Sequence, residues 1–425
     1  PLESVHSVTV PGAVSLFEEV AEKFGNLGLK ELCTQPIKYA EEGVVVSPRV
    51  SFDWDLHRKK LIGPSAKFYL DSGNPYKAGS LFKAPMQAEV LRQIAAHGSK
   101  GFYQSDITTD LVSSLKEFGG VHSLADFENV KVQYVDPTYA ELKDGSTLIE
   151  LPPNGQGLTA IMMKKMMEFC NIDRFSAGSF ERVHLEAEIA KVAYSARNNF
   201  IGDPNFSEVK QNIFLDDAYL EQLSREISIG KLLNDSLEND FFARNKDTVL
   251  ICAADSEGNA ISLIFSSFHA FGSGLCSKKY GLLFHNRGAG FVLKKDHPNE
   301  LMGGKRPLHT IIPAILQEKN GSIMPFGVMG GQYQANGHAR ILSNIKDYGM
   351  GFQEALNFPR SFYFNGVLNV ERGYKKDVTE KLNKVGYTVQ EATIPIGGAQ
   401  LVRVDSSGSL LGASDPRKDG CALGY

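Results

Sequence analysis

The spacing of apolar positions changes near residue 245 of this 425-residue chain. From residue 11 to about 230 apolar residues recur at helical spacing, as in AVSLFEEVAEKFG, which places its apolar side chains on one face and for which Gly25 is the expected stop. After Asn245 short apolar runs alternate with glycines and turn residues, which indicates strands. The pattern therefore predicts a mixed α/β fold with a helix-rich first part and a strand-rich second part.

The same pattern predicts the individual elements. Helices are expected at 13–24, 29–42, 86–97, 107–118, 156–170, 180–199, 217–227, 335–348 and 376–384. Strands are expected at 132–135, 146–151, 249–254, 260–266, 281–285, 308–312, 323–328, 362–370 and 401–404. The polar, weakly periodic segment 224–247 between the two parts has the composition of a surface linker.

Composition narrows the class of protein. Hydrophobic residues make up 42% and charged residues 22%, the balance of a soluble globular protein. A net charge of -4 and the lack of a long basic run argue against nucleic acid as a partner, and small substrates fit better. The sequence contains no run of about 18 uncharged apolar residues, the length needed to cross a membrane.

The cysteines bear on the compartment. The chain has five, without CxxC spacing, so neither a zinc site nor a full disulfide framework is suggested. The chain begins Pro-Leu-Glu-Ser without a signal-like segment. We therefore expect a reducing compartment and a cytoplasmic location.

Most standard catalytic motifs are missing from the sequence. We find no GxSxG, HExxH, GxxxxGK[ST] or GxGxxG after a strand, which removes the commonest serine hydrolase, zinc protease and nucleotide-binding interpretations. The methionine-rich run AIMMKKMMEFC is interpreted as flexible core filling rather than as a ligand site.

Thr248 stands between the polar linker and the apolar run 249–254. Threonine often begins a strand, which is one explanation. Cleavage between Asp247 and Thr248 is another, because it would give Thr248 a free α-amine beside its hydroxyl, a base and a nucleophile in one residue. With a reference pKa of about 7.7–8.0, an α-amine is suited to take the hydroxyl proton.

Such a mechanism also needs donors for the oxyanion of a tetrahedral intermediate. Gly330 and Gly331 lie between an expected strand and an expected helix, where backbone N–H groups can serve this purpose. From the sequence alone, a tight turn is the alternative explanation for the same two glycines.

Blocks of sequence along nearly the whole chain resemble the gamma-glutamyltransferase family, in the order found in that family. They are HSVTVPGAV, LPPNGQGL, DTVLICAADSEGNAISL, FGSGL, HNRGAGF, GGKRPLHTIIPA, FGVMGGQ and the final GASDPRKDGCALGY. So many blocks in order make this resemblance much more specific than any single motif.

The resemblance implies a fold, a processing event and roles for residues. It implies a four-layer αββα sandwich of the N-terminal nucleophile hydrolase type, cut by the protein itself into a large-subunit part, 1–247, and a small-subunit part, 248–425. It assigns Thr248 as cleavage residue and nucleophile, and Ser266 as a supporting hydroxyl on the neighbouring strand. Gly330 and Gly331 become the oxyanion hole.

The chain also departs from the family's pattern at the donor site. Phe268 and Gly290 stand where the typical enzyme has an asparagine and an aspartate, and His309 and Thr310 replace a pair of serines that help to hold the donor. The arginine that binds the donor carboxylate in the family belongs to an N-terminal segment without a counterpart in these residues. Without the aspartate, an ammonium group in a partly desolvated site costs several kcal/mol, so a donor with a free α-amine should be held poorly.

Arg287, in HNRGAGF, adds a planar cation that suits a carboxylate, although a surface arginine on a hairpin is an alternative. This version of the motif resembles a branch related to cephalosporin acylases and oxamate amidohydrolases. We therefore expect an amidohydrolase whose acyl group ends in a carboxylate, with Arg287, His309 and Thr310 as substrate-binding residues. The alternatives are an authentic glutathione hydrolase or transferase, and an unprocessed scaffold or binding protein.

The expected partners follow from this interpretation. They are a small-molecule amide and the two subunits of one precursor, with a homodimer of such heterodimers as a further option. No metal or organic cofactor is implied by the resemblance, and no nucleic acid or membrane partner is expected.

Overall fold

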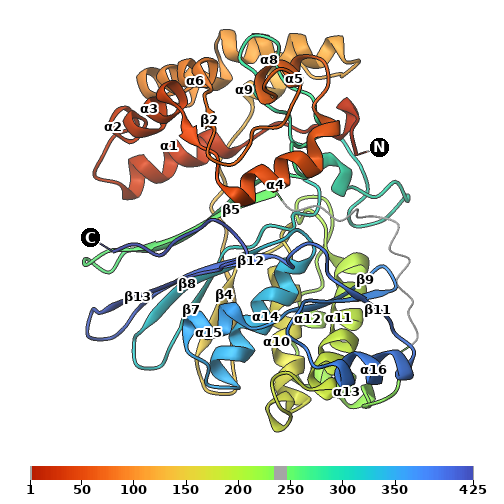
Figure 1. The fold of residues 1–425 in the computed structure, drawn as a ribbon. Coiled ribbons are helices and arrows are strands. Elements are labelled where there is room, and N and C mark those ends of the chain that lie inside the picture. Colours follow the sequence, from red (N-terminus) through yellow and green to blue (C-terminus); the bar gives the residue numbers. More distant parts are fainter. Residues whose placement is uncertain (1, 234–246, 425) are drawn as a thin grey trace. The chain divides into compact units, whose positions relative to one another are not determined.

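A computed structural model of the protein describes residues 2–233 and 247–424, and the chain forms two compact units (Figure 1). Unit 1 consists of Pro1–Tyr134 and Ser266–Ala289, and unit 2 of Val135–Phe265 and Gly290–Tyr425. Each unit contains residues from both sides of the predicted cleavage bond. The central part of the predicted linker, 234–246, lies outside the described residues.

Unit 1 is mainly helical. Its helices are α1 (Ala13–Phe24), α2 (Leu29–Leu32), α3 (Thr34–Glu42), α4 (Pro48–His57), α5 (Pro64–Tyr69), α6 (Pro85–His97), α7 (Lys100–Tyr103), α8 (Asp106–Glu117) and α9 (Leu124–Glu128), with the 3₁₀ turns η1 (Val5–Ser7) and η2 (Arg58–Lys60) and the strands β1 (Val44–Val45) and β2 (Leu81–Phe82). Local signals begin several of these helices. The Ser105 hydroxyl accepts a hydrogen bond from Ile107 N at the start of α8, and Ser123 forms a capping box with Asp126 at α9.

Unit 2 contains most of the strands. Its elements are β3 (Thr138–Glu141), β4 (Thr147–Glu150), α10 (Gly157–Phe169), η3 (Ile172–Arg174), α11 (Phe180–Phe200), α12 (Asn212–Leu215), α13 (Asp217–Glu226), β5 (Asp247–Ala254), β6 (Ala260–Phe268, which ends in unit 1), η4 (Arg287–Gly290, which begins in unit 1), β7 (Ala314–Gln317), β8 (Ile323–Met329), α14 (Tyr333–Lys346), α15 (Phe352–Asn357), β9 (Ser361–Phe364), β10 (Val367–Val370), α16 (Lys376–Val385), β11 (Thr388–Glu391), β12 (Gly398–Val404) and β13 (Leu410–Ser414).

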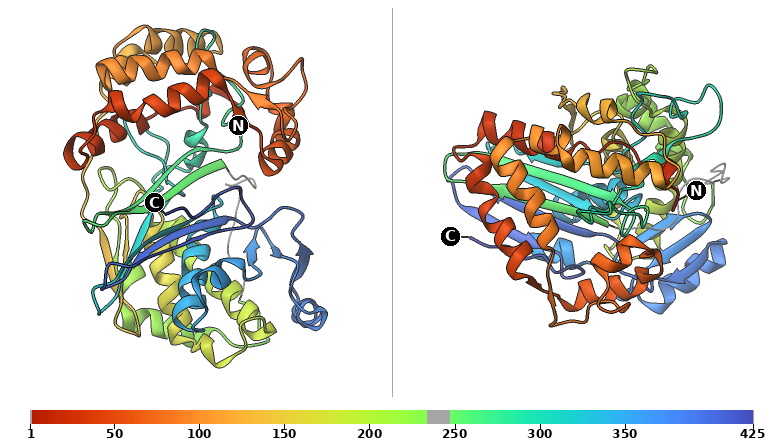
Figure 2. Two further views of the ribbon diagram at one scale, coloured as in Figure 1. Left: turned by 60° about the vertical axis from the view of Figure 1, so that its left-hand side comes forward. Right: turned by 90° about the horizontal axis from the view of Figure 1, so that it is seen from above.

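A six-stranded antiparallel sheet forms the centre of unit 2, in the order β13-β12-β8-β7-β4-β3. Helices α10 and α14 pack on one face of this sheet, and β5 of the β5–β6 pair packs against β8 and β12 on the other face (Figures 1 and 2). Unit 2 thus contains three successive layers, helices, sheet and strand pair. The separate sheet β11-β10-β9 packs against α11 and α16.

The β5–β6 pair closes on the turn that the sequence predicts. The Asp255 carboxylate accepts hydrogen bonds from the backbone N–H groups of Glu257 and Asn259, at 3.0 and 2.9 Å, and from the Asn259 side chain at 2.8 Å. These bonds hold a short loop without burying it, as is typical of aspartate in turns.

Many of the predicted elements are confirmed to within a few residues. Helices α1, α6, α8, α10, α11, α13, α14 and α16 and strands β4, β5, β6, β8 and β12 match them. The methionines of α10 are fully buried in the core, as predicted. None of the helices in the described residues is both long and apolar enough to cross a membrane.

Other predicted elements are wrong. The predicted strand 132–135 is irregular, with Tyr134 and Val135 exposed. The predicted helix 29–42 breaks at Cys33 into α2 and α3, and the predicted strand 362–370 is the hairpin β9–β10. Asn365 and Gly366 make its turn with positive φ values of 51° and 74°, the Asn-Gly signal of a two-residue hairpin.

The predicted strands 281–285 and 308–312 are also wrong. Residues 281–285 pair through irregular loop bonds with 273–277 and form a single bridge, Cys276 with Leu283. Residues 308–312 run beside 154–156, again with one bridge, and β7 begins only at Ala314, after Pro313, which lacks an N–H group. Burial in packed loops explains why these runs are apolar.

Candidate active site

Thr248 is the second residue of β5, and its side chain is buried, with 7% exposed. Its neighbours alternate, because Val249 and Ile251 are 44% and 47% exposed whereas Leu250 is buried. Side chains two residues apart in a strand share a face, so Thr248 points to the same side as Leu250. The Leu250 methyl groups lie against Gly327 of β8, so this is the side that faces the six-stranded sheet.

Ser266 is near the end of β6 and is partly buried. Its Oγ accepts a hydrogen bond of 2.9 Å from Phe268 N. This bond fixes the serine side chain at the point where the strand ends, and Phe268 there has a positive φ of 75°.

The Gly330–Gly331 turn joins β8 to α14, with φ values of +134° and +59°. A Cβ atom at Gly330 would lie 2.9 Å from the Gly397 Cα atom, so a side chain does not fit there. The Gly330 and Gly331 carbonyl groups accept the first hydrogen bonds of the helix, from Tyr333 N at 3.1 Å and Gln334 N at 3.2 Å. Among the described residues, neither glycine N–H is donated to an acceptor.

Buried side chains that the sequence did not single out form hydrogen bonds to the Gly330–Gly331 turn. Gln156 donates through Nε2 to the carbonyl oxygens of Thr310, at 2.7 Å, and Gly331, at 3.3 Å. Arg197, fully buried on α11, donates to the side-chain oxygen of Gln156 at 2.7 Å and also to that of Gln332. The structure thus brings Thr310 and Gly331 together, and the only sequence signal was the position of Gln156 within LPPNGQGL.

His309 is held by its own loop. Its Nδ1 atom lies 2.7 Å from the Pro307 carbonyl oxygen and 2.8 Å from Asn154 Nδ2, and its backbone N–H donates to the Asn154 carbonyl at 2.8 Å. The Nδ1 atom of His309 is therefore used in packing residues 307–309 against residues 154–155.

Arg287 lies in unit 1 and is 4% exposed. Its Nη1 atom is buried without a hydrogen-bond partner in the described residues. Burial lowers the pKa of this guanidinium to about 9. A buried cation with an unused donor is costly unless an anion completes it, so the environment of Arg287 is one that favours a bound anion.

Two buried histidines share this environment in unit 1. The pKa of His269 is lowered to about 3, first by burial and then by Lys60, Arg287 and His57, and that of His285 is lowered to about 3 by burial and by Arg287. Both rings are therefore neutral near pH 7. The charged groups that act on them are cations, which adds to the positive potential around Arg287.

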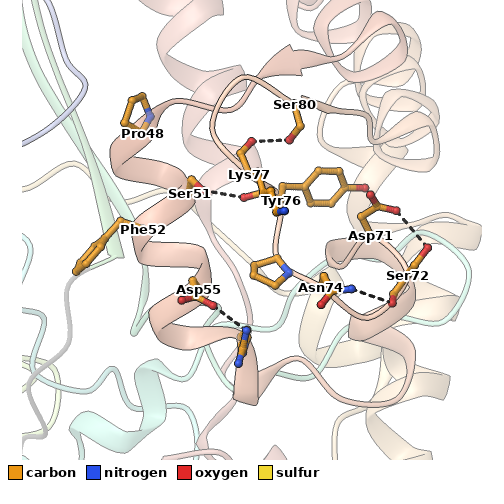
Figure 3. Close-up of a pocket in the computed structure, with 12 residues that line it drawn as sticks. Pro48, Ser51, Phe52, Asp55, Asp71, Ser72, Asn74, Tyr76, Lys77 and Ser80 are labelled. Carbon is orange, nitrogen blue, oxygen red and sulfur yellow. Dashed lines mark hydrogen bonds and ion pairs between the residues drawn. The ribbon is translucent and has the colours of Figure 1, made fainter.

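A hollow of about 890 Å³ lies elsewhere in unit 1, between α4 and the loop 71–80 (Figure 3). Polar groups line it, among them Ser51, whose hydroxyl donates to the Tyr76 carbonyl at 3.0 Å, and Asp55, which pairs with Arg58. None of its lining residues belongs to the predicted site, and we do not assign the chemistry to it.

The fold is shared with a solved structure. Over 100% of this chain and 80% of the other, the structure is similar to cephalosporin acylase from Bacillus halodurans, with a TM-score of 0.89 and 28% identity.

The family follows from the sequence comparisons. The sequence model described as gamma-glutamyltranspeptidase matches residues 1–425, so the chain belongs to the gamma-glutamyltranspeptidase family. It is 30% identical to the glutathione hydrolase-like YwrD proenzyme of Bacillus subtilis, over 100% of this chain and 82% of that protein. It is 27% identical to the oxamate amidohydrolase proenzyme of Klebsiella pneumoniae, over 99% of this chain and 81% of that protein. The family, the fold and these relatives make the protein an amide hydrolase of the N-terminal nucleophile class.

Proposed function

We propose that the protein is a self-processed amidohydrolase that cleaves its substrate through an acyl-enzyme on Thr248. Cleavage of the Asp247–Thr248 bond frees the α-amine of Thr248. The amine takes the proton of the Thr248 hydroxyl while the oxygen attacks the amide carbonyl, and the resulting oxyanion accepts hydrogen bonds from the N–H groups of Gly330 and Gly331. The amine then gives the proton to the departing nitrogen, and water hydrolyses the ester that remains.

Strand pairing supports the role proposed for Ser266. Asp255 N donates to Asn259 O at 3.1 Å, and Cys252 Sγ lies 4.0 Å from Ser262 Oγ. Regular antiparallel pairing counted from these residues predicts that Thr248 stands opposite Ser266. A hydroxyl opposite the nucleophile can orient the free α-amine or the attacking oxygen.

The observation that carries the substrate proposal is the buried Nη1 atom of Arg287, which has no hydrogen-bond partner in the part of the chain that the structure describes. A carboxylate of the acyl group would supply the missing acceptor in a charge-assisted hydrogen bond. Gly290 offers no acidic group to an ammonium. We therefore propose an amide whose acyl part carries a carboxylate but no neighbouring ammonium, with His309 and Thr310 lining the donor position that they occupy in the family's pattern.

The proposal also includes the four-layer sandwich and the division of the chain into two subunits. The helix, sheet and strand layers of unit 2 agree with three layers of the four-layer αββα sandwich, and they support this fold. Residues 1–247 and 248–425 would form the large and small subunits. They would stay associated after the cut, because strands from both subunits belong to one sheet, in which β4 of the large-subunit part pairs with β7 of the small-subunit part.

An authentic glutathione hydrolase is the second candidate, favoured by relatives with that name. The chain is 26% identical, for example, to the glutathione hydrolase proenzyme of Escherichia coli, over 98% of this chain and 75% of that protein. In this case the donor ammonium would have a partner that differs from the family's asparagine and aspartate, which Phe268 and Gly290 replace.

One comparison of substrates tests the proposal. Glutaryl, oxalyl and γ-glutamyl anilides are offered to the same preparation, and the rate of aniline release is measured. We expect faster cleavage of an anilide without the α-ammonium. A clear preference for the γ-glutamyl anilide would favour the glutathione hydrolase, and a single uncut chain that cleaves none of them would favour the unprocessed scaffold.

A further inference from the structure

A buried acid and a buried histidine of unit 2 have no part in the chemistry described above. Glu150, the last residue of β4, and His338, on α14, both have fully buried side chains, and Glu150 Oε1 lies 2.7 Å from His338 Nδ1. The other ring nitrogen, Nε2, accepts a hydrogen bond of 3.2 Å from Val328 N. Since Nε2 is an acceptor, the ring is neutral and its proton is on Nδ1, which donates to Glu150.

The position of Val328 in the sheet explains why its N–H bonds to a side chain. The neighbouring strand β7 begins at Ala314, which stands opposite Phe326, two residues before Val328. Backbone groups of residues two apart in a strand point to the same side, so Val328 N–H points to where β7 has ended. His338 takes the place of the missing strand there, and its ring also packs on Phe326, with 4.9 Å between ring centroids.

Glu150 holds the histidine in this role. It stands opposite Ala314 in the β4–β7 pair, at the start of β7. Without an acceptor at Nδ1, the ring could move its proton to Nε2, and two N–H groups would then face each other at Val328. The carboxylate therefore selects the tautomer that can accept from Val328.

The glycines that follow Val328 need such a support. Glycine adopts many backbone conformations at similar energy, so a Gly-Gly turn does not by itself fix the directions of its N–H groups. The far end of the turn is held at Gln332, whose carbonyl accepts a 2.5 Å hydrogen bond from the Tyr194 hydroxyl. The near end is held at Val328 by His338.

We propose that Glu150 and His338 are positioning residues for the amide hydrolysis. They fix the end of β8 and, through it, the N–H groups of Gly330 and Gly331 at the oxyanion. This inference rests on the proposed function, because it assumes that these N–H groups bind the oxyanion.

Substitutions of His338 that differ by one methylene test the proposal. His338→Gln places an amide oxygen near the position of Nε2, whereas His338→Asn keeps the amide but ends short of Val328. We expect His338→Asn to lower kcat for the best anilide by about 10²-fold, as for a misplaced catalytic group, with little change in KM. His338→Gln should recover most of this loss.

Glu150 offers a second matched pair. Glu150→Gln keeps an acceptor for Nδ1–H and should retain most of the kcat, whereas Glu150→Leu removes the acceptor and should lower kcat like His338→Asn. Combining Glu150→Leu with His338→Asn should add little to either loss, because both act on one hydrogen bond.

The control is another buried histidine of unit 2. His184 contacts the Ser228 carbonyl at 3.1 Å and the Tyr387 hydroxyl at 2.9 Å, away from the turn. His184→Asn should lower the melting temperature without lowering kcat in the same way. Hydrogen exchange of the Val328 amide, measured on folded protein, should rise in His338→Asn but not in His184→Asn.

The possible failures can be told apart. If the wild type cleaves no anilide, the proposed function fails and the positioning role fails with it. If the wild type is active and folded His338→Asn keeps the wild-type kcat, only the positioning role is overturned. The same holds if His338→Asn and His184→Asn change kcat and KM to the same extent.

Discussion

The guanidinium group of Arg287 lies over the aromatic ring of Phe268, with 4.7 Å between Cζ and the ring centroid. The ring covers one face of the cation, and the edge of the cation is left to donate hydrogen bonds. The buried Nη1 atom on this edge has no partner in the described residues. By the resemblance to the family, Phe268 stands where the typical member has an asparagine, so the expected loss of an ammonium ligand coincides with a ring placed against Arg287.

Removing the guanidinium should weaken the use of carboxylated substrates. A charge-assisted hydrogen bond contributes about 1.5–3 kcal/mol, so Arg287→Ala should lower kcat/KM for a glutaryl anilide by roughly 10- to 150-fold. The loss should be much smaller for an uncharged acyl analogue of the same length. Steady-state kinetics with both anilides measures the difference.

The matched control for this variant is Arg58→Ala, which removes a half-exposed arginine of the same unit that pairs with Asp55 at 2.9 Å. It should leave both substrates unaffected. Equal losses for the charged and uncharged anilides in Arg287→Ala would show that Arg287 has a structural role only.

Thr248 should be required for the cut as well as for turnover. The wild-type chain of 46.6 kDa should give pieces of about 27 and 19.5 kDa, since cleavage before Thr248 divides the sequence there. Thr248→Ala should remain one intact band on a denaturing gel, while Thr248→Ser, which keeps a hydroxyl, should still be cut. Continued processing of Thr248→Ala would exclude this residue as the cleavage nucleophile.

The turn between β8 and α14 should not tolerate a β-branched side chain at Gly331. Its φ of +59° disfavours a β-branched residue, and a displaced N–H removes one oxyanion donor, so Gly331→Val should lower kcat by about 10²–10³-fold. Gly349→Val is the control, because Gly349 has a similar φ of +64° in open space beyond the other end of α14. If both variants keep the wild-type kcat, the oxyanion donors lie elsewhere.

The pH dependence of kcat/KM should differ between charged and uncharged substrates. The α-amine must be neutral to act as a base, so activity on either substrate should rise as the pH passes about 7.7–8.0. Arg287 binds a carboxylate only as a cation, and burial lowers its pKa to about 9, so activity on the glutaryl anilide alone should fall as the pH rises through that value. The pKa values of His269 and His285, lowered to about 3 mainly by burial, lie outside this range.

The pH profiles are measured on both anilides with one preparation over the same buffers. A fall near pH 9 for the uncharged substrate as well would assign that step to another group. A profile for the glutaryl anilide that stays level above pH 9 would remove Arg287 from carboxylate binding.

The local signals in the sequence were sufficient for many elements. Gly25 ends α1, the periodic run 180–199 is nearly all of α11, and the Asp255–Asn259 loop closes β5 on β6, because caps, periodicity and turn residues act between neighbours in the chain. The family, Thr248 and the glycine pair were likewise identified from sequence blocks, although their roles remain predictions.

Only the tertiary structure separated strands from packed loops. The runs 281–285 and 308–312 are as apolar as true strands, but strand formation depends on a partner that is distant in sequence, and these segments meet other loops instead. The same reason applies at Cys33, where one periodic run is divided into α2 and α3.

The contacts of the buried side chains around the candidate site could not be predicted from the sequence either. A glutamate at 150 and a histidine at 338 give no local sign of contact. Nor does the sequence show that Arg287 has a buried donor without a partner among the residues that the structure describes. A side chain's partners depend on which distant segments the fold brings beside it. The sequence by itself therefore determined the family, much of the secondary structure and the candidate nucleophile, whereas long-range packing decided which buried groups meet and which are left for a ligand.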